Sequence, residues 1–262
     1  MNSIVFVGGG RITSALLAGL RLARFKAPII MHDRHATKLR VLKRRYGVQV
    51  ESDLQAAVAR AGLLVIAVRP EAAADLAEQI QPISRTLSAI SLAAGIPMSL
   101  LRARMGPPVR WARAMPSPVC RIGRGLTAVT FARNFPVAAR RRVLGLFRAV
   151  GAVLEIPESK FDAFTVTYSS SHGYHALAAL AEAAEKVGLD RRSALAAASH
   201  ALADGVAAWR EGSLSLNHLL HEAATPGGVA AAVMESMNAN GYREAVQRGL
   251  IAGMKRAKQN AK

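Results

Sequence analysis

Three consecutive glycines near the amino end of the chain have the position of a nucleotide-binding turn. The segment Gly8-Gly9-Gly10-Arg11-Ile12-Thr13 follows the apolar run Ile4–Val7 and precedes residues with helical spacing. A sharp turn at Gly8 and the missing side chain at Gly10 let the backbone approach a pyrophosphate. The free N–H groups and positive end of the following helix then hold the anion. A plain tight turn is the alternative, because glycine turns are common and Thr13 replaces the third glycine of the usual pattern.

A second candidate position lies where the next apolar run ends. Ile29–Met31 is followed by Asp33 and Arg34. An acidic residue here accepts hydrogen bonds from a free 2′-hydroxyl of the adenosine ribose, whereas an arginine pairs with a 2′-phosphate. Further basic side chains follow closely, namely His35, Lys38 and Arg40. The local charge therefore favours NADPH over NADH, with NADH still possible. The alternative is that Arg34 is only a solvated loop residue.

The charge of the whole chain is strongly positive. Lysine and arginine total 35 against 17 acidic residues, which gives a formal net charge of +18. Such an excess is the usual electrostatic footprint of a nucleic-acid-binding protein. However, the arginines are scattered, no zinc-finger or RNA-recognition motif is present, and aromatic residues make up only 5%. We therefore expect no nucleic-acid partner, and a positive potential that attracts phosphorylated small molecules.

Cysteine content and hydropathy exclude several other classes. Cys120 is the only cysteine, which rules out a disulfide framework, a thiolate zinc site and an iron–sulfur cluster. Histidine spacing matches no metal site, so we predict no metal. Apolar runs such as Leu63–Val68 are far shorter than the roughly 20 residues of a membrane span. We expect no export signal, no membrane association and a cytoplasmic location.

The elements that position the glycine turn alternate between strands and helices. Helical spacing is predicted over 12–25 and 37–46, while short apolar runs predict strands at Ile4–Val7, Ile29–Met31, Leu63–Val68, Ala89–Leu92 and Val109–Ala112. Strands separated by helices imply a mainly parallel sheet covered on both faces. We therefore expect an α/β, Rossmann-like domain over residues 1–157.

The remainder of the chain has a different character. After Pro157 the sequence is rich in alanine and leucine, with hardly any strand signal. Long helices are predicted at 161–187 and 191–209, and a shorter one at 218–224. The stretch 228–257 completes an all-helical second half. Alanine-rich faces allow close helix packing, so residues 158–262 are expected to form an all-α domain that a second subunit completes.

Several segments together resemble one known family. Their order along the chain is that of Δ1-pyrroline-5-carboxylate reductases: Gly8-x-Gly10, Ala67-Val68-Arg69-Pro70, Ser91-Leu92-Ala93-Ala94-Gly95, Arg113-Ala114-Met115-Pro116 and Thr225-Pro226-Gly227-Gly228. The resemblance covers nearly the whole chain. It implies a Rossmann domain that binds NAD(P)H and a helical dimerisation domain, with five dimers able to form a decamer. The implied reaction is hydride transfer to the C=N carbon of a cyclic imino acid, which gives L-proline.

The resemblance assigns roles to segments on the cofactor side. Val68-Arg69-Pro70 resembles the segment that passes over the cofactor, and Ala93-Ala94-Gly95 the small-residue loop beside the nicotinamide. Met115-Pro116-Ser117 is similar to the turn that flanks the nicotinamide, with Ser117 in place of the usual asparagine. Thr225-Pro226-Gly227-Gly228 resembles the family's carboxylate cradle at a helix start. A helix start without a ligand is the alternative for this last motif.

The substrate side departs from the family pattern. Where the family usually has a Ser-Gly-Ser-x-Pro-Ala-Tyr run, this chain has Tyr168–Tyr174 with a different sequence. Ala230 stands in place of a threonine that contacts the imine side of the substrate in the family. Leu220-His221 replaces a Lys-Asp pair. Imine reduction needs hydride on carbon and a proton or hydrogen bond at nitrogen. The candidate catalytic residues are Ser170, His172 and Thr225, with Ser171 and Tyr174 as further donors. Substrate binding is assigned to Ser171, Thr225, Gly227 and Gly228. A structural role for His172, as a helix cap or interface residue, is the alternative.

Three functions remain open at this stage. The first is NAD(P)H-dependent reduction of Δ1-pyrroline-5-carboxylate, which would place the protein in proline biosynthesis. The second is reduction of a different imino acid on the same fold, which Ala230 and the altered serine run favour. The third is binding of NADP without turnover.

Overall fold

The computed structural model describes residues 3–80 and 82–261. By its contacts, the chain divides into two compact units. The first unit contains the chain up to Tyr168 together with the segment from Gly253 onward, and the second contains Ser169–Ala252.

One sheet forms the centre of the first unit. Its strand order is β3-β2-β1-β4-β5-β6-β7-β8. The strands are β1 (Ile4–Val7), β2 (Ile29–His32), β3 (Gln49–Val50), β4 (Leu63–Ile66), β5 (Leu87–Ser91), β6 (Val109–Met115), β7 (Gly125–Phe131) and β8 (Gly151–Glu155). All neighbouring pairs are parallel except β6 and β7, which are antiparallel. This confirms the predicted α/β class with a mainly parallel sheet.

Alternating side chains of the strands form two hydrophobic cores. On β1, Ile4 and Phe6 belong to one core, and Val5 and Val7 belong to the other. All four side chains are almost completely buried, because helices cover both faces of the sheet. A strand that is buried on both faces appears in the sequence as a continuous apolar run, which is why Ile4–Val7 was recognisable.

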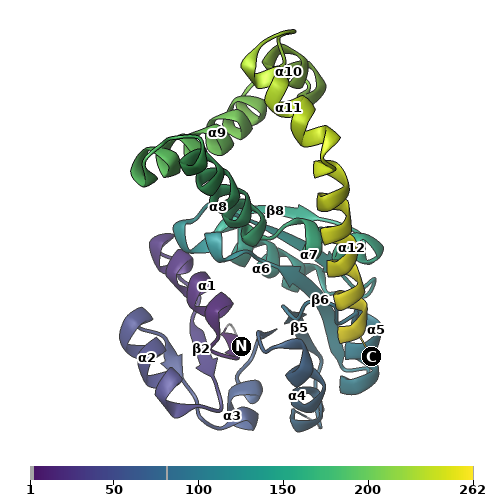
Figure 1. The fold of residues 1–262 in the computed structure, drawn as a ribbon. Helices are drawn as coiled ribbons and strands as arrows, with labels where there is room; N and C mark the ends of the chain where they lie inside the picture. The colour runs from purple at the N-terminus through teal and green to yellow at the C-terminus, as the bar shows by residue number, and fades with distance from the viewer. Residues whose placement is uncertain (1–2, 81, 262) are drawn as a thin grey trace. The chain divides into compact units, whose positions relative to one another are not determined.

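Helices cover both faces of the sheet (Figure 1). The first core is built with α1 (Arg11–Leu22), α2 (Ala36–Tyr46) and α6 (Val137–Arg148), and the second with α3 (Leu54–Ala59), α4 (Ala73–Gln79) and α5 (Met98–Met105). Short 3-10 helices, η1 (Pro70–Ala72) and η2 (Pro118–Ile122), and helix α7 (Glu158–Thr167) complete the unit. The first strand–helix–strand passage thus brings the glycine turn to the carboxyl end of β1.

The last part of the sheet was not predicted. The predicted strands end at Ala112, whereas β6 continues to Met115 and is followed by β7 and β8. β7 contains glycine, threonine and alanine, so it lacks the continuous apolar run that identified the central strands. Its pairing with the buried β6 supplies the stabilisation that its own composition does not show.

The long helix predicted over 161–187 is wrong because the structure interrupts it. The helix predicted over 161–187 is divided into α7 and α8 (Ser170–Lys186), with Tyr168 leaving the helical conformation. The Tyr168 hydroxyl accepts a hydrogen bond from the backbone N–H of Leu126, at 2.7 Å. The helical structure predicted over 228–257 is confirmed and consists of α11 (Val229–Ala239) and α12 (Tyr242–Asn260), which are separated at Gly241, whose φ is +77°.

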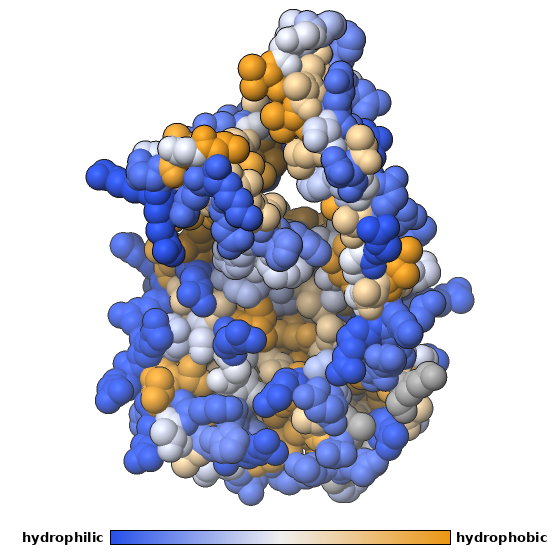
Figure 2. Space-filling view, in the orientation of Figure 1, coloured by the Kyte–Doolittle hydropathy of each residue, from blue (hydrophilic) through white to orange (hydrophobic). Residues whose placement is uncertain are grey.

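The second unit is helical and leaves much apolar surface exposed. It contains α8, α9 (Arg191–Glu211), α10 (Leu216–Ala223), α11 and the first part of α12. Figure 2 shows apolar patches over these elements, in the upper part of the view. Their exposed side chains include Leu180, Leu195, Leu202, Val206, Trp209, Leu220, Val233 and Met237. Within the described ranges, no helix is both long and apolar enough to cross a membrane.

Candidate dinucleotide-binding site

The glycine turn has the backbone conformation that its sequence predicts. Gly8 has a φ of +108°, and a Cβ added there would lie 2.7 Å from the carbonyl oxygen of Ala67 on the neighbouring chain segment. Gly8 therefore tolerates no side chain, for reasons of both conformation and space. At Gly10, by contrast, an added Cβ would meet no described atom within 4 Å. The turn is open at Gly10, where the glycine pattern predicts that a pyrophosphate approaches.

Thr13 stabilises the turn from the first turn of α1. Its side chain is fully buried, and its Oγ1 donates a hydrogen bond to the carbonyl oxygen of Gly8 at 2.6 Å. The threonine in place of the third glycine thus contributes a polar contact that holds Gly8 in position.

The amino end of α1 has the properties of an anion-binding site. Gly10 is its N-cap, and in the described part of the chain no side chain caps the helix there. The first turn, which contains Arg11 and Ile12, also has no acidic residue. The first N–H groups of a helix lack intrahelical partners and lie at the positive end of the dipole. A bound phosphate satisfies both the unpaired donors and the charge.

Asp33 uses both carboxylate oxygens to order the backbone around the turn. Oδ2 accepts a hydrogen bond from the N–H of Gly9 at 2.7 Å, and Oδ1 accepts one from the N–H of His35 at 2.8 Å. Nζ of Lys38 lies 3.8 Å from Oδ2. Asp33 is also buried, with 8% of its surface exposed. The carboxylate that the sequence analysis weighed as a ribose ligand therefore connects β2, the glycine turn and the start of α2.

The neighbouring basic side chains remain exposed at the pocket. Nε of Arg34 donates a hydrogen bond to Nε2 of His35 at 3.2 Å, so the two side chains are held together. Both residues line the same cavity as Lys38 and the three glycines. This arrangement places three basic groups beside the point where a dinucleotide presents its adenosine ribose.

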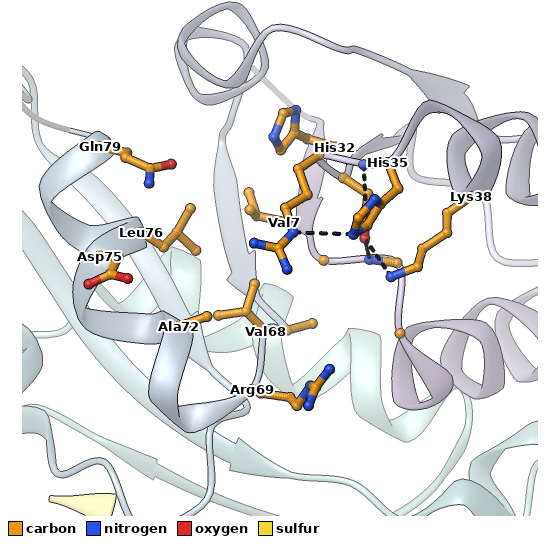
Figure 3. Close-up of a pocket in the computed structure, with 16 residues that line it drawn as sticks. Val7, His32, His35, Lys38, Val68, Arg69, Ala72, Asp75, Leu76 and Gln79 are labelled. Carbon is orange, nitrogen blue, oxygen red and sulfur yellow. Dashed lines mark hydrogen bonds and ion pairs between the residues drawn. The ribbon is translucent and has the colours of Figure 1, made fainter.

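The cavity has a volume of about 280 Å³ and lies between two groups of elements. Figure 3 shows His35 and Lys38 on one side, and Asp75, Leu76 and Gln79 of α4 on the other. Val68 and Arg69, which follow β4, also line it, and Pro70 begins η1 directly afterwards. The structure thus brings together the predicted residues Gly8, Gly10, Arg34, Val68 and Arg69, and the composition of their cavity fits a dinucleotide. His35 and Asp75 are lining residues that the sequence analysis did not select as ligands.

The predicted nicotinamide loop follows β5. The N–H of Ala93 donates to Oγ of Ser91 at 3.2 Å, and the carbonyl oxygen of Ala94 accepts from Nδ2 of Asn260 at 3.1 Å. Gly95 is buried with a φ of +77°, and an added Cβ would lie 2.3 Å from the carbonyl oxygen of Ala257. Helix α12 therefore occupies the space that Gly95 leaves. Asn260 carries no local sequence signal that would have linked it to this loop.

The turn after β6 is ordered by its own side chain. Ser117 is the N-cap of η2, and its Oγ accepts a hydrogen bond from the N–H of Val119 at 3.3 Å. Cys120 lies within η2, fully buried against α1, and is not among the residues that line the described dinucleotide cavity. Burial raises the pKa of the Cys120 thiol from 9.0 to about 11, despite the opposing charge of Arg121. Such a thiol is a poor nucleophile.

The predicted substrate residues lie on two helix starts of the second unit. Ser169 is the N-cap of α8, and its carbonyl oxygen accepts from the N–H of His172 at 3.1 Å. Oγ of Ser169 lies 2.7 Å from Oγ of Ser171, next to Ser170. The capping residue is thus Ser169 and not His172, whose side chain is exposed.

The second helix start is the turn before α11. The N–H of Gly228 donates to the carbonyl oxygen of Thr225 at 2.9 Å, and Gly227 has a φ of +75°. Gly228 is the N-cap of α11, and no described side chain caps this helix. Ala230 is the second residue of α11 and is exposed. The turn therefore presents backbone N–H donors, as a carboxylate site requires.

No cluster of three or more histidine, cysteine, aspartate or glutamate side chains that could hold a metal occurs among residues 3–80 and 82–261. The polar groups described above are instead backbone N–H donors, hydroxyls and basic side chains. These groups suit phosphate and carboxylate ligands.

The fold and this site define a class of protein. An open, mainly parallel sheet with a glycine turn and an uncapped helix start at the carboxyl ends of its central strands is typical of dinucleotide-binding proteins. Residues 3–95 match the family model "NADP oxidoreductase coenzyme F420-dependent", and residues 158–260 match the family model "Pyrroline-5-carboxylate reductase dimerisation".

Curated relatives match along the whole chain. A pyrroline-5-carboxylate reductase of Mycobacterium tuberculosis is 30% identical over 291 residues, which cover 99% of this chain and 97% of the relative. One of Methanosarcina acetivorans is 26% identical and covers 100% of this chain and 98% of its own length. The chain belongs to the pyrroline-5-carboxylate reductase family and is an oxidoreductase.

Solved structures have the same fold. The pyrroline carboxylate reductase of Plasmodium falciparum, solved with NADP bound, superimposes with a TM-score of 0.89 at 21% identity, covering 99% of this chain and 98% of that one. The enzyme of Streptococcus pyogenes superimposes with a TM-score of 0.90 at 22% identity, covering 98% of each chain.

Proposed function

We propose that this protein reduces Δ1-pyrroline-5-carboxylate to L-proline, with NADPH as the preferred cofactor. The observation that carries the proposal is the pairing of the uncapped start of α1 at the glycine turn with a family-specific dimerisation segment over 158–260. The first supplies a site for a dinucleotide, and the second is particular to pyrroline-5-carboxylate reductases. Whole-length curated relatives with that activity in their names support the same conclusion.

The cofactor is a nicotinamide dinucleotide, which supplies a hydride to the imine carbon when bound. The N–H groups of Arg11 and Ile12 at the start of α1 are proposed to hold its pyrophosphate. Val68, Arg69 and Pro70 are proposed to contact it at the end of β4. We propose that Ala93, Ala94 and Gly95 contact the nicotinamide end of the cofactor.

NADPH preference is proposed to come from Arg34, with His35 and Lys38 beside it. The carboxylate of Asp33 already accepts hydrogen bonds from two backbone N–H groups. The side chains that remain to meet a ligand at the end of β2 are therefore the basic ones. Replacing Arg34 with Ala removes a charged hydrogen bond and should weaken NADPH binding by about 1.5–3 kcal/mol. Binding of NADH should change little. Fluorescence titration with both cofactors tests this, and an equal loss for both would refute the role of Arg34.

The substrate carboxylate is proposed to bind at Thr225–Gly228. The N–H groups at the start of α11 have no described side-chain cap, and a carboxylate would satisfy them as a phosphate does. Gly227 occupies a left-handed conformation that shapes this turn. Ser171 is proposed as a further contact from the start of α8.

The reaction adds a hydride to carbon and a proton to nitrogen, so a proton donor must serve the imine nitrogen. Ser170, His172 and Thr225 are the proposed donors, and His172 carries the imidazole, the side chain that most often transfers protons in enzymes. Because Ser169 caps α8, loss of the His172 imidazole leaves that cap in place. His172→Ala should therefore lower turnover and flatten its pH profile. Unchanged turnover with a reduced melting temperature would assign His172 a structural role.

The protein assembles through its helical segment, which matches the dimerisation family. We propose a homodimer that forms a decamer of five dimers, with 1–157 as the cofactor domain and 158–262 as the dimerisation and substrate domain. The single buried thiol suits a reducing compartment, and we propose the cytoplasm.

The activity test is NADPH oxidation with and without Δ1-pyrroline-5-carboxylate, followed by identification of proline. A second candidate function is reduction of a different imino acid, because exposed Ala230 offers no hydroxyl to the substrate. A panel of cyclic imines separates the two candidates. Binding of NADPH without turnover of any imine would favour the non-catalytic alternative.

A further inference from the structure

The last turn of α12 contacts the loop that connects β5 to α5. This β5–α5 loop comprises residues 92–97. Nδ2 of Asn260 donates a hydrogen bond to the carbonyl oxygen of Ala94 at 3.1 Å, across 166 positions of sequence. The backbone of Ala257, one turn earlier in α12, lies against buried Gly95. The last turn of α12 thus contacts two successive residues of the loop, once by a hydrogen bond and once by close packing.

The remaining anchors of the loop lie within the sheet and at its far end. The N–H of Leu92 donates to the carbonyl oxygen of Ile66 at 2.9 Å, and Ala93 is bonded to Oγ of Ser91. At the other end, the N–H of Met98 donates to Oε1 of Glu158 at 3.0 Å. Between these anchors, Ala94 and Gly95 form the tip of the loop. Within residues 3–80 and 82–261, the Asn260 side chain is the one that donates a hydrogen bond to this tip.

We propose that Asn260 is a positioning residue that fixes the tip of the β5–α5 loop beside the nicotinamide. The inference rests on the proposed function, which assigns Ala93, Ala94 and Gly95 to the nicotinamide side of the cofactor. Hydride transfer depends steeply on the distance between donor and acceptor carbons, and small displacements of a positioning group slow it strongly. A loop tip released from α12 gives the nicotinamide ring a less defined position.

Substitution of Asn260 should lower turnover more than it lowers the affinity for the cofactor. Pyrophosphate and ribose contacts are assigned to the glycine turn and to Arg34, which do not touch Asn260. Loss of the Asn260 contact therefore leaves those contacts in place. This separation distinguishes a positioning role from a general contribution to binding.

The variant that tests the proposal is Asn260→Asp, which keeps the shape of the side chain. The carboxylate cannot donate and faces the Ala94 carbonyl, so the hydrogen bond is replaced by repulsion. Asn260→Ala removes the donor without adding charge and serves if the aspartate variant fails to fold. The matched control is Gln259→Ala, an adjacent exposed residue of the same helix.

Three measurements on the purified full-length protein decide the outcome. We expect kcat to fall about tenfold in Asn260→Asp, while the dissociation constant of NADPH from fluorescence titration changes less than twofold. The isotope effect on kcat with deuterated NADPH should rise, because hydride transfer becomes slower relative to other steps. Gln259→Ala should behave as the unmodified protein. An unchanged kcat and isotope effect in both Asn260 variants would overturn the proposal.

Hydrogen exchange separates this inference from the proposed function. If the unmodified protein does not reduce Δ1-pyrroline-5-carboxylate, the proposed function fails, but the contact itself can still be tested. Amide exchange of a peptide spanning the β5–α5 loop should be faster in Asn260→Asp than in Gln259→Ala, with and without NADPH. Equal exchange in the two variants would show that Asn260 does not hold the loop.

Discussion

The guanidinium of Arg113, on β6, donates a hydrogen bond at 3.0 Å to Oε1 of Glu158, the first residue of α7. The same guanidinium donates to Oδ1 of Asp162 at 2.8 Å and lies 4.3 Å above the centre of the Phe161 ring. Only 1% of the Arg113 side chain is exposed, whereas the side chains of Glu158 and Asp162 are 33% and 30% exposed. Two turns of α7 are thus fixed to the strand that leads into Met115-Pro116-Ser117.

We predict that Arg113→Met lowers the free energy of unfolding by about 2–4 kcal/mol. The substitution leaves two carboxylates side by side without their cation, and their partial exposure moderates the cost. Arg113→Lys should recover only part of the loss, because one ammonium cannot reproduce the guanidinium geometry. Urea denaturation measures both, with Arg110→Met on the same strand as the control. A loss below about 1 kcal/mol in Arg113→Met would contradict this role.

Replacing Asp33 with Ala should weaken NADPH and NADH equally. The substitution removes the acceptor of the Gly9 and His35 N–H groups and so loosens the turn that holds the pyrophosphate, which both cofactors share. We expect a loss of about 1 kcal/mol for each hydrogen bond. Parallel titrations with both cofactors provide the measurement. A selective loss of NADH would instead identify Asp33 as a ligand of the free 2′-hydroxyl.

Ala230→Thr tests whether the substrate site has diverged within the family. The side chain is exposed at the second position of α11, so a threonine adds its hydroxyl without crowding the core. If the protein forms proline, we expect kcat/KM for Δ1-pyrroline-5-carboxylate to increase. Steady-state kinetics on both proteins give the answer. No gain, together with good turnover of another imine by the unmodified protein, would favour the second candidate function.

The exposed apolar face of the helical unit predicts an obligate dimer with an interface well above roughly 2,000 Å². Val206 and Trp209 lie one turn apart on α9 and are 53% and 46% exposed. Val206→Glu should weaken assembly, because it places a charge on this face. Light scattering measures the change, with Val137→Glu on α6 of the first unit as a control. A folded monomer of the unmodified protein at micromolar concentration would refute the prediction.

Cys120 should make stability depend on pH in the alkaline range. Burial raises its pKa from 9.0 to about 11 in the folded state, so the unfolded chain loses the thiol proton first. The folded state therefore keeps its full stability below about pH 9 and loses about 2–3 kcal/mol between pH 9 and 11. The unfolding free energy of Cys120→Ala should fall less steeply over that interval. Identical slopes for the two proteins would disprove the effect.

Local signals were sufficient for the central strands of the sheet and for the glycine turn. The apolar runs at Ile4–Val7 and Leu63–Val68 predict buried strands because both faces of the sheet are covered. The glycine turn is recognisable because Gly8 needs a positive φ, a requirement that belongs to the residue itself. The alanine-rich composition after Pro157 likewise predicts helices, since propensity and spacing act over a few residues.

Contacts between distant segments decided the rest. Tyr168 interrupts a helical pattern at the point where its hydroxyl meets the backbone of Leu126, and β7 forms because β6 offers it a partner. The direction of the Asp33 carboxylate depends on its hydrogen bond with Gly9, 24 positions away. The carbonyl group of Ala94 is likewise held by a hydrogen bond from the distant Asn260. A sequence specifies what each side chain can donate or accept. Which group it meets is fixed only when folding brings the two segments together, because hydrogen bonds and packing act over a few ångströms in space regardless of separation along the chain.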